Sequence, residues 1–290
     1  MSNGYSLHIG LNAVDPAHYA GWDGKLKGCE NDAKDMLAIA QYRNYNNSTL
    51  LLTKDATIRN VTNEIKKAAE KLKSGDIFFL SYSGHGGSVA DTNNDELDHK
   101  DETWCLYDGQ FLDDELYDLW FQFKENVRII VLSDSCHSGT ILRARYYGLS
   151  TTSNQNNKTY RFMPLEIVDK VFEQNREFYM NKKRKNNERD LSGLKSSIKL
   201  ISGCQDNQYS QDGEVNGLFT EKLLKVWNNG QFSGKYLDFY KSITIQMPPD
   251  QTPNYYNIGV INDVFNNQSP FSINNMRANE ELKKEVSFTV

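Results

Sequence analysis

Short apolar runs alternate with amphipathic helical patterns along most of the chain. The runs at 77–82 and 127–132 are continuously apolar and aromatic, which is typical of strands buried on both faces of a sheet. Other expected strands lie at 5–14, 49–52 and 198–202, and expected helices at 28–41, 58–72, 113–123 and 218–227. Strands that alternate with helices predict right-handed crossovers and an α/β fold with a mostly parallel sheet flanked by helices.

Two of the predicted buried strands end in small, turn-prone residues that carry chemistry. The run 77–82 is followed by Ser-Gly-His-Gly-Gly, with His85 at its centre, and 127–132 by Ser-Asp-Ser-Cys-His-Ser-Gly, with Cys136 at its centre. Ligands bind at the carboxyl ends of parallel strands, so we expect this thiol and imidazole to meet at one sheet edge. Such a pair suits nucleophilic attack on a carbonyl, with the Gly86 and Cys136 amides donating to the oxyanion.

A lone histidine or cysteine is more often structural, as a turn residue or a buried thiol. Two such groups, each ending a buried strand, favour catalysis, and their separation of 136 − 85 = 51 residues is close to the roughly 50 of caspases. His137 adjoins Cys136, and because neighbouring side chains diverge it is not the expected base. The other thiols lack a matching histidine: Cys29 in a helix, Cys105 in an acidic loop, and Cys204, the best rival nucleophile, after a later strand.

The segments at 82–86 and 134–139 resemble the two signature segments of metacaspases, which are caspase-fold cysteine endopeptidases with bacterial relatives. The resemblance extends in element order over about residues 5–265. It implies a caspase-like three-layer sandwich, His85 as base, Cys136 as nucleophile, and cleavage after Arg or Lys. We therefore expect a peptidase domain over 1–265 and a polar tail over 266–290, in a monomer acting on protein or peptide substrates.

A pocket for a basic side chain needs carboxylates, because burying an unpaired cation is costly. Asp134 lies two residues before Cys136 and can face such a pocket. The metacaspase pattern adds the helix start at 28–32 and implies that Asp32 joins it. The same pattern implies that Cys29 and Ser83 line the pocket with Asp32 and Asp134, and Asp206 and Asp212 are weaker candidates for its rim. The alternatives are a helix-dipole charge for Asp32 and a turn hydrogen bond for Asp134.

An acidic loop raises the question of a cation. Residues 91–102 have oxygen ligands at four EF-hand positions, but Glu96 stands where the turn needs glycine, so the loop is either solvated or a looser cation site. Many metacaspases are calcium-activated through other carboxylates, of which three match here: Asp101, Asp113 and Asp114. The fourth position is Arg143, a cation, so we expect no required cofactor and an absent or weakened calcium dependence. Asp113 and Asp114 also suit the acidic first turn of a helix.

The stretch 143–194 is long, polar and rich in basic residues. In an enzyme that cuts after basic residues it is a candidate for self-cleavage, and metacaspases are often nicked in a similar linker. The residues at which processing is expected are Arg143, Arg145, Lys183, Arg184 and Lys185. The alternative is a solvated, disordered insertion.

Composition narrows the function classes. The chain has 290 residues, 38% of them hydrophobic and 12% aromatic, with a net charge of −5, which gives no reason to expect nucleic acid or a membrane as a partner. The start does not resemble a secretory signal and the four cysteines are far apart, so we expect a cytoplasmic protein. Alternatives are a non-catalytic caspase-fold scaffold, a calcium-binding regulatory module, and a caspase-fold peptidase preferring Asn or Asp. Charge repulsion by Asp32 and Asp134 disfavours an Asp before the scissile bond of the substrate.

Overall fold

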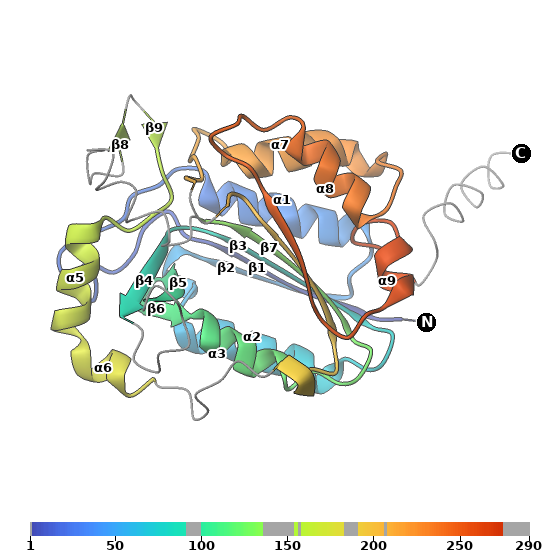
Figure 1. Ribbon diagram of the computed structural model, residues 1–290, viewed down its shortest axis with the longest axis horizontal. Helices are drawn as coiled ribbons and strands as arrows, with labels where there is room; N and C mark the ends of the chain where they lie inside the picture. Colours follow the sequence, from blue (N-terminus) through green and yellow to red (C-terminus); the bar gives the residue numbers. More distant parts are fainter. Residues whose placement is uncertain are drawn as a thin grey trace, which may run out of the picture.

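In the computed structural model, one mixed sheet lies between two layers of helices (Figure 1). The structure describes residues 2–90, 100–135, 154–155, 158–182, 191–205 and 208–274. In spatial order the sheet contains β11 (Asn254–Gly259), β10 (Ser197–Ser202), β7 (Arg128–Asp134), β3 (Ile77–Ser83), β1 (Gly4–Gly10) and β2 (Asn47–Leu52). Neighbouring strands are parallel except for the β10–β11 pair, which is antiparallel. The predicted α/β sandwich with a mostly parallel sheet is confirmed.

Side chains along the central strands point alternately to the two faces of the sheet and pack against the two layers of helices. One face of the sheet carries α1 (Cys29–Tyr42), α7 (Leu218–Trp227) and α8 (Tyr236–Thr244), and the other carries α2 (Ile58–Lys71) and α3 (Asp113–Trp120) (Figure 1). Phe79 and Ile130 pack in the first layer, whereas Phe78 and Ile129 pack in the second. Burial on both faces explains why the runs at 77–82 and 127–132 are continuously apolar.

A second, antiparallel sheet lies beside the first and was not predicted from the sequence. It consists of β4 (Gly86–Ala90), β5 (Lys100–Leu106) and β6 (Gly109–Leu112). Helices α5 (Leu165–Gln174) and α6 (Arg176–Met180) cover it, with Val168, Val171 and Tyr179 buried in a shared cluster. Two expectations change as a result. Cys105 lies in a buried strand and not in an acidic loop, and much of the stretch 143–194 is folded.

Element ends follow local signals. Thr57 caps α2 as predicted, since its hydroxyl accepts a hydrogen bond of 3.2 Å from the Asn60 amide. The shorter elements are β8 (Asn154–Gln155), β9 (Lys158–Thr159) and α9 (Asp263–Asn267), with 3₁₀ turns at Thr53–Asp55, Leu191–Gly193 and Asn228–Gly230. The first part of the expected tail, which follows α9, packs on the sheet. Buried Arg128 of β7 donates to the Ile273 carbonyl in this tail and to the Gly75 carbonyl, both at 2.7 Å.

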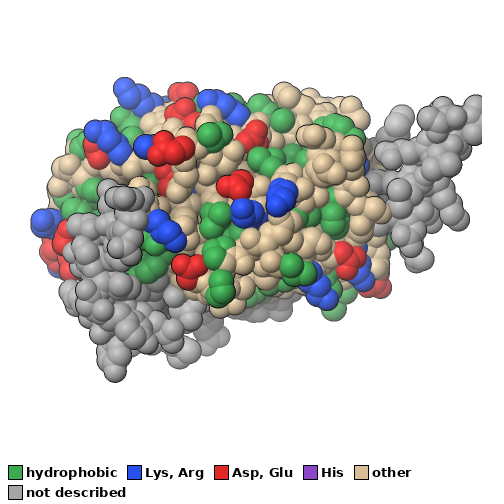
Figure 2. Space-filling model, turned by 90° about the horizontal axis from the view of Figure 1, so that it is seen from above, with side chains coloured by type: hydrophobic (Ala, Val, Ile, Leu, Met, Phe, Trp, Pro, Cys, Tyr) green, Lys and Arg blue, Asp and Glu red, His purple; other side chains and the backbone are tan. Residues whose placement is uncertain are grey.

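On the described part of the face in Figure 2, lysine and arginine side chains are interspersed with acidic ones. None of the helices in the described ranges has the length and apolar character needed to cross a bilayer.

Candidate active site

The fold brings three predicted pocket residues to the carboxyl edge of the main sheet. Ser83 ends β3 and pairs in register with Asp134, which ends the neighbouring strand β7. Asp32 lies in the first turn of α1 and accepts a hydrogen bond of 2.7 Å from the Ser83 hydroxyl. The fourth expected residue, Cys29, is buried beside them: burial raises the pKa of its thiol, and the positive charge of Arg161 opposes that rise.

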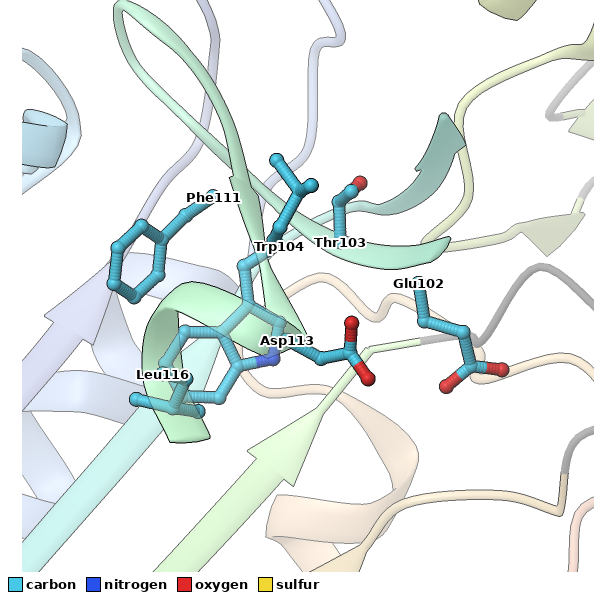
Figure 3. Close-up of a pocket in the computed structure, with 7 residues that line it drawn as sticks. Glu102, Thr103, Trp104, Phe111, Asp113 and Leu116 are labelled. Atoms are coloured by element: carbon cyan, nitrogen blue, oxygen red, sulfur yellow. The ribbon is translucent and has the colours of Figure 1, made fainter. Parts of the chain in front are cut away.

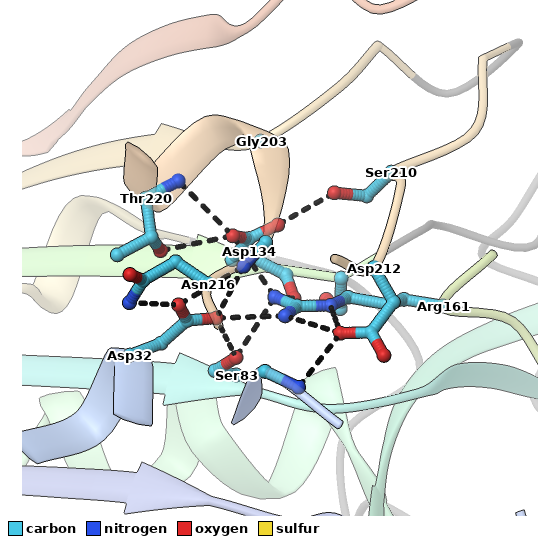
Figure 4. Close-up of polar contacts among 12 residues, drawn as sticks. Asp32, Ser83, Asp134, Arg161, Gly203, Ser210, Asp212, Asn216 and Thr220 are labelled. Atoms are coloured by element: carbon cyan, nitrogen blue, oxygen red, sulfur yellow. Dashed lines mark hydrogen bonds and ion pairs between the residues drawn. The ribbon is translucent and has the colours of Figure 1, made fainter. Parts of the chain in front are cut away.

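This pocket is filled by a residue that the sequence did not predict, Arg161, which lies between β9 and α5 (Figure 4). Its guanidinium lies 2.7 Å from the Asp32 carboxylate and 2.9 Å from that of Asp134. It also lies 2.9 Å from Asp212, and it donates to the Ser83 hydroxyl at 2.8 Å. The guanidinium is 0% exposed and the three carboxylates are at most 2% exposed. The cation is therefore paired within a closed cluster.

Other donors, besides Arg161, also hold the carboxylates in place. Asp134 accepts hydrogen bonds from the hydroxyls of Ser210, at 2.5 Å, and Thr220, at 2.9 Å. Asp32 accepts from the side-chain amide of Asn216 at 3.0 Å and from the backbone amide of Gly217 at 3.1 Å. These donors come from the segment between β10 and α7 and from the first turn of α7, so the pocket joins distant parts of the chain (Figure 4).

The pocket is shaped for a flat, planar cation. A Cβ atom at Gly217 would lie 2.5 Å from the guanidinium carbon of Arg161, so only glycine leaves room for the group at this position. Burial raises the pKa of Asp32, while Arg161 lowers it. For the guanidinium itself, burial acts to lower the pKa, but the nearby carboxylates, Asp134 foremost, raise it well above its ordinary value. The arrangement stabilises a buried positive charge.

His85 lies next to this pocket, where β3 gives way to β4. Its Nε2–H donates to the Gly24 carbonyl at 3.0 Å, and its ring packs on Trp22 with centroids 4.7 Å apart. Gly24 has a φ of +53°, in the left-handed region that favours glycine. Burial lowers the pKa of His85 to about 4, although the Gly24 carbonyl acts to raise it. The imidazole is neutral at pH 7, and its buried Nδ1 has no hydrogen-bond partner among the described residues.

The amide of Gly86, which was predicted to face an oxyanion, has a carbonyl partner. It donates a hydrogen bond of 3.1 Å to the backbone carbonyl of Arg161, the same residue whose side chain fills the pocket. One arginine therefore presents its side chain to the carboxylates and its carbonyl to the predicted oxyanion donor. Cys136 and Asp206 lie outside the described residues, as do the expected processing positions Arg143, Arg145, Lys183, Arg184 and Lys185.

The acidic residues considered for a cation lie apart from this site. Asp101 is in β5, while Asp113 and Asp114 form the first turn of α3. Glu102 and Asp113 line a cavity of about 40 Å³ whose other walls are largely apolar (Figure 3). Within the part of the chain that the structure describes, no three His, Cys, Asp or Glu side chains are grouped to hold a metal ion.

Some residues of the pocket could be predicted from the sequence and others could not. Asp212, expected only at the rim, contacts the guanidinium directly. The missed residues are Arg161, Ser210, Asn216, Gly217 and Thr220, all of which lie in irregular segments or at a helix start. No local pattern marks them, because their roles depend on contacts between segments far apart in the sequence.

Comparison with known proteins defines the class. The sequence matches the caspase domain family, Peptidase C14, over residues 13–265, and the chain belongs to that family. It is 36% identical to metacaspase-1A of Neurospora crassa over 155 residues, which cover 49% of this chain and 33% of that protein. It is 27% identical to metacaspase-1 of Mycosarcoma maydis over 255 residues, covering 77% of this chain and 62% of that protein. The chain thus spans only part of the length of these curated relatives.

Solved structures agree with this assignment. Protein GSU0716 from Geobacter sulfurreducens is 52% identical with a TM-score of 0.86, covering 94% of this chain and 99% of that one. Caspase-1 from Spodoptera frugiperda shares the fold, with a TM-score of 0.50 at 8% identity and coverage of 89% and 88%. The resemblance to metacaspases seen in the two motifs is confirmed, and the chain contains the caspase domain that defines this family.

Proposed function

We propose that this chain is a cysteine endopeptidase that cleaves peptide bonds after Arg or Lys, with Cys136 as nucleophile and His85 as base. One observation carries the proposal: the carboxylate pocket beside His85 holds an arginine side chain, that of Arg161. A substrate arginine in the same place would make the same ion pairs, and among the described residues the pocket offers an acidic side chain no other cation once Arg161 is displaced.

The mechanism follows from the groups around that position. His85 takes the proton of the Cys136 thiol, and the thiolate attacks the carbonyl carbon of the bound residue. The amides of Gly86 and Cys136 donate to the oxyanion, and removing one such donor typically slows an enzyme about 100- to 1000-fold. His85 then protonates the leaving amine. The neutral imidazole implied by its low pKa is the form able to accept the first proton.

The remaining expectations accompany this proposal. The substrates are proteins or peptides, the enzyme is a cytoplasmic monomer, and it processes itself within 143–194. No metal is required, since Arg143 occupies the position of the fourth calcium ligand in the family pattern.

A second candidate is a non-catalytic caspase-fold scaffold. It is favoured by the closure of the pocket, because a guanidinium that is 0% exposed among carboxylates at most 2% exposed is also what a permanent structural cluster looks like. In that case Arg161 would never leave, and the chain would cleave nothing.

The test is a panel of fluorogenic peptides that differ only in the residue before the scissile bond, with Arg, Lys, Gln, Asn or Asp. We expect the wild-type chain to cleave the Arg and Lys peptides, Cys136→Ala to cleave none, and Cys204→Ala, which removes another buried thiol, to retain most activity. An active Cys136→Ala variant contradicts the assigned nucleophile. A wild-type chain that cleaves no member of the panel contradicts the peptidase proposal and favours the scaffold.

A further inference from the structure

The segment that carries Arg161 is bound as an added strand. The Arg161 amide donates to the Ser210 carbonyl at 2.9 Å, and the Asp212 amide donates to the Thr159 carbonyl at 2.8 Å. Tyr160 forms an antiparallel bridge with the residue between these partners. Backbone pairing of this kind is how extended peptides are recognised at an exposed strand, with alternate side chains entering pockets.

On its other side, the same segment is hydrogen-bonded to Gly86, which directly follows His85. Gly86 donates to the Arg161 carbonyl at 3.1 Å, and the Met163 amide donates back to the Gly86 carbonyl at 2.8 Å. The backbone of Phe162 is near enough to His85 to affect its pKa, which burial lowers to about 4 and the Gly24 and Phe162 backbones act to raise. The Arg161–Phe162 peptide bond therefore lies beside the base and the oxyanion donor.

We infer that residues 159–162 are a substrate built into the chain: the enzyme cuts its own Arg161–Phe162 bond and is blocked by this segment until it does so. This inference rests on the proposed cysteine peptidase function. It identifies a cleavage site different from the basic positions at 143, 145 and 183–185, because Arg161 is the basic residue that the described structure holds in the pocket.

The chemistry is a hydrolysis that consumes one water. The Cys136 sulfur forms a bond to the Arg161 carbonyl carbon, the C–N bond to Phe162 breaks, and His85 delivers the thiol proton to the new amine of Phe162. Water then attacks the thioester, which gives the Arg161 carboxylate and restores the thiol. The new end at 161 is free to leave with its guanidinium, and that exit opens the pocket.

The bound segment also shows which neighbours of the arginine are recognised. The rings of Tyr160 and Phe162 both pack against the ring of Tyr209, with centroids 5.2 and 5.0 Å from it. Aromatic pairs at these distances are favourable beyond simple burial. Tyr209 is thus a specificity-determining residue, and segments with aromatic residues on both sides of Arg are the substrate class that this site selects.

Intact-mass analysis of the full-length chain during incubation tests the inference. We expect the wild type to yield two fragments, 1–161 and 162–290, and Cys136→Ala to stay whole. Peptide hydrolysis is expected to begin with a lag that matches this cut. Tyr209→Ala is expected to slow the cut about tenfold, whereas Arg176→Gln, at an exposed arginine on α6, leaves it unchanged.

A second variant avoids the loss of stability expected when Arg161 itself is replaced. Phe162→Pro keeps Arg161 and its ion pairs, removes no hydrogen bond that Phe162 is seen to donate, and replaces the leaving group by a hindered tertiary amide. We expect this variant to stay whole and to remain blocked. A wild type that hydrolyses Arg peptides while the Arg161–Phe162 bond stays intact overturns the inference but leaves the proposed function standing. A wild type that cleaves neither itself nor any peptide overturns both.

Discussion

Replacing Arg161 by glutamine in the uncleavable Cys136→Ala chain tests whether the buried cation holds the pocket together. The guanidinium lies 2.7–2.9 Å from three carboxylates that are at most 2% exposed. Removing one partner of a buried ion pair typically costs about 3–5 kcal/mol, because the other charge stays buried. We therefore expect the free energy of unfolding to fall by about 3–5 kcal/mol at pH 7.5, which in a chain of this size lowers Tm by about 10 °C.

The loss of stability caused by Arg161→Gln is expected to depend on pH, whereas a loss of packing alone would not. Burial already raises the pKa of Asp32 with Arg161 in place, and without the guanidinium that pKa rises further. A carboxyl whose folded pKa is raised contributes most stability at low pH and loses it as pH rises through the folded value. The difference between Arg161→Gln and its parent is thus larger at pH 7.5 than at pH 5.

Urea unfolding followed by tryptophan fluorescence measures both effects, and Arg176→Gln is the matched control. Arg176 pairs with Glu173 on the surface, where its side chain is 58% exposed, so its loss is expected to change stability by less than about 0.5 kcal/mol. The reasoning is refuted if Arg161→Gln costs less than about 1 kcal/mol, or if its cost is the same at pH 5 and pH 7.5.

Three further predictions address the site. Asp134→Asn is expected to lower kcat/KM for Arg peptides about 100-fold, with the exposed Asp169→Asn as control; equal rates for both variants would contradict the pocket. Burial lowers the pKa of His85 from 6.5 to about 4, so the free energy of unfolding falls as the pH falls through this window. In the Cys136→Ala chain, His85→Ala should reduce the number of protons taken up on unfolding in this window by about one. An unchanged pH dependence of stability would contradict this prediction. Hydrolysis of Arg peptides is expected to be similar in chelator and in millimolar calcium, and a large calcium requirement would contradict the interpretation of Arg143.

The main sheet could be predicted because its signals are local. The strands β3 and β7 are buried on both faces and therefore appear as continuous apolar runs, and their ends carry glycine, serine and aspartate turns. Parallel neighbours end at the same edge, so the ends of these two strands were expected to lie together, and Ser83 pairs in register with Asp134. The family pattern had placed Ser83 in the pocket. The pocket residue Asp32 came from the family pattern and is confirmed as a neighbour of Ser83 by their hydrogen bond.

The occupied pocket could not be predicted, because nothing near Arg161 distinguishes it from the other basic residues of a polar stretch. Its partner Asp32 is 129 residues away in the sequence, and Ser83 is 78 residues away. The small sheet of β4, β5 and β6 was missed for a related reason: its strands are short and mixed in polarity, and helices from the 158–182 region supply much of their burial. Both features depend on tertiary contacts and not on local periodicity.

The carboxylate pocket is proposed to select a positive charge on the residue before the scissile bond. The most direct measurement compares kcat/KM for two otherwise identical peptides, one with arginine and one with its neutral isostere citrulline, on wild-type chain incubated until its mass is constant. Citrulline is expected to lower kcat/KM by roughly 100-fold or more, because the buried carboxylates then lose their cation. Equal kcat/KM values for the two peptides would contradict it.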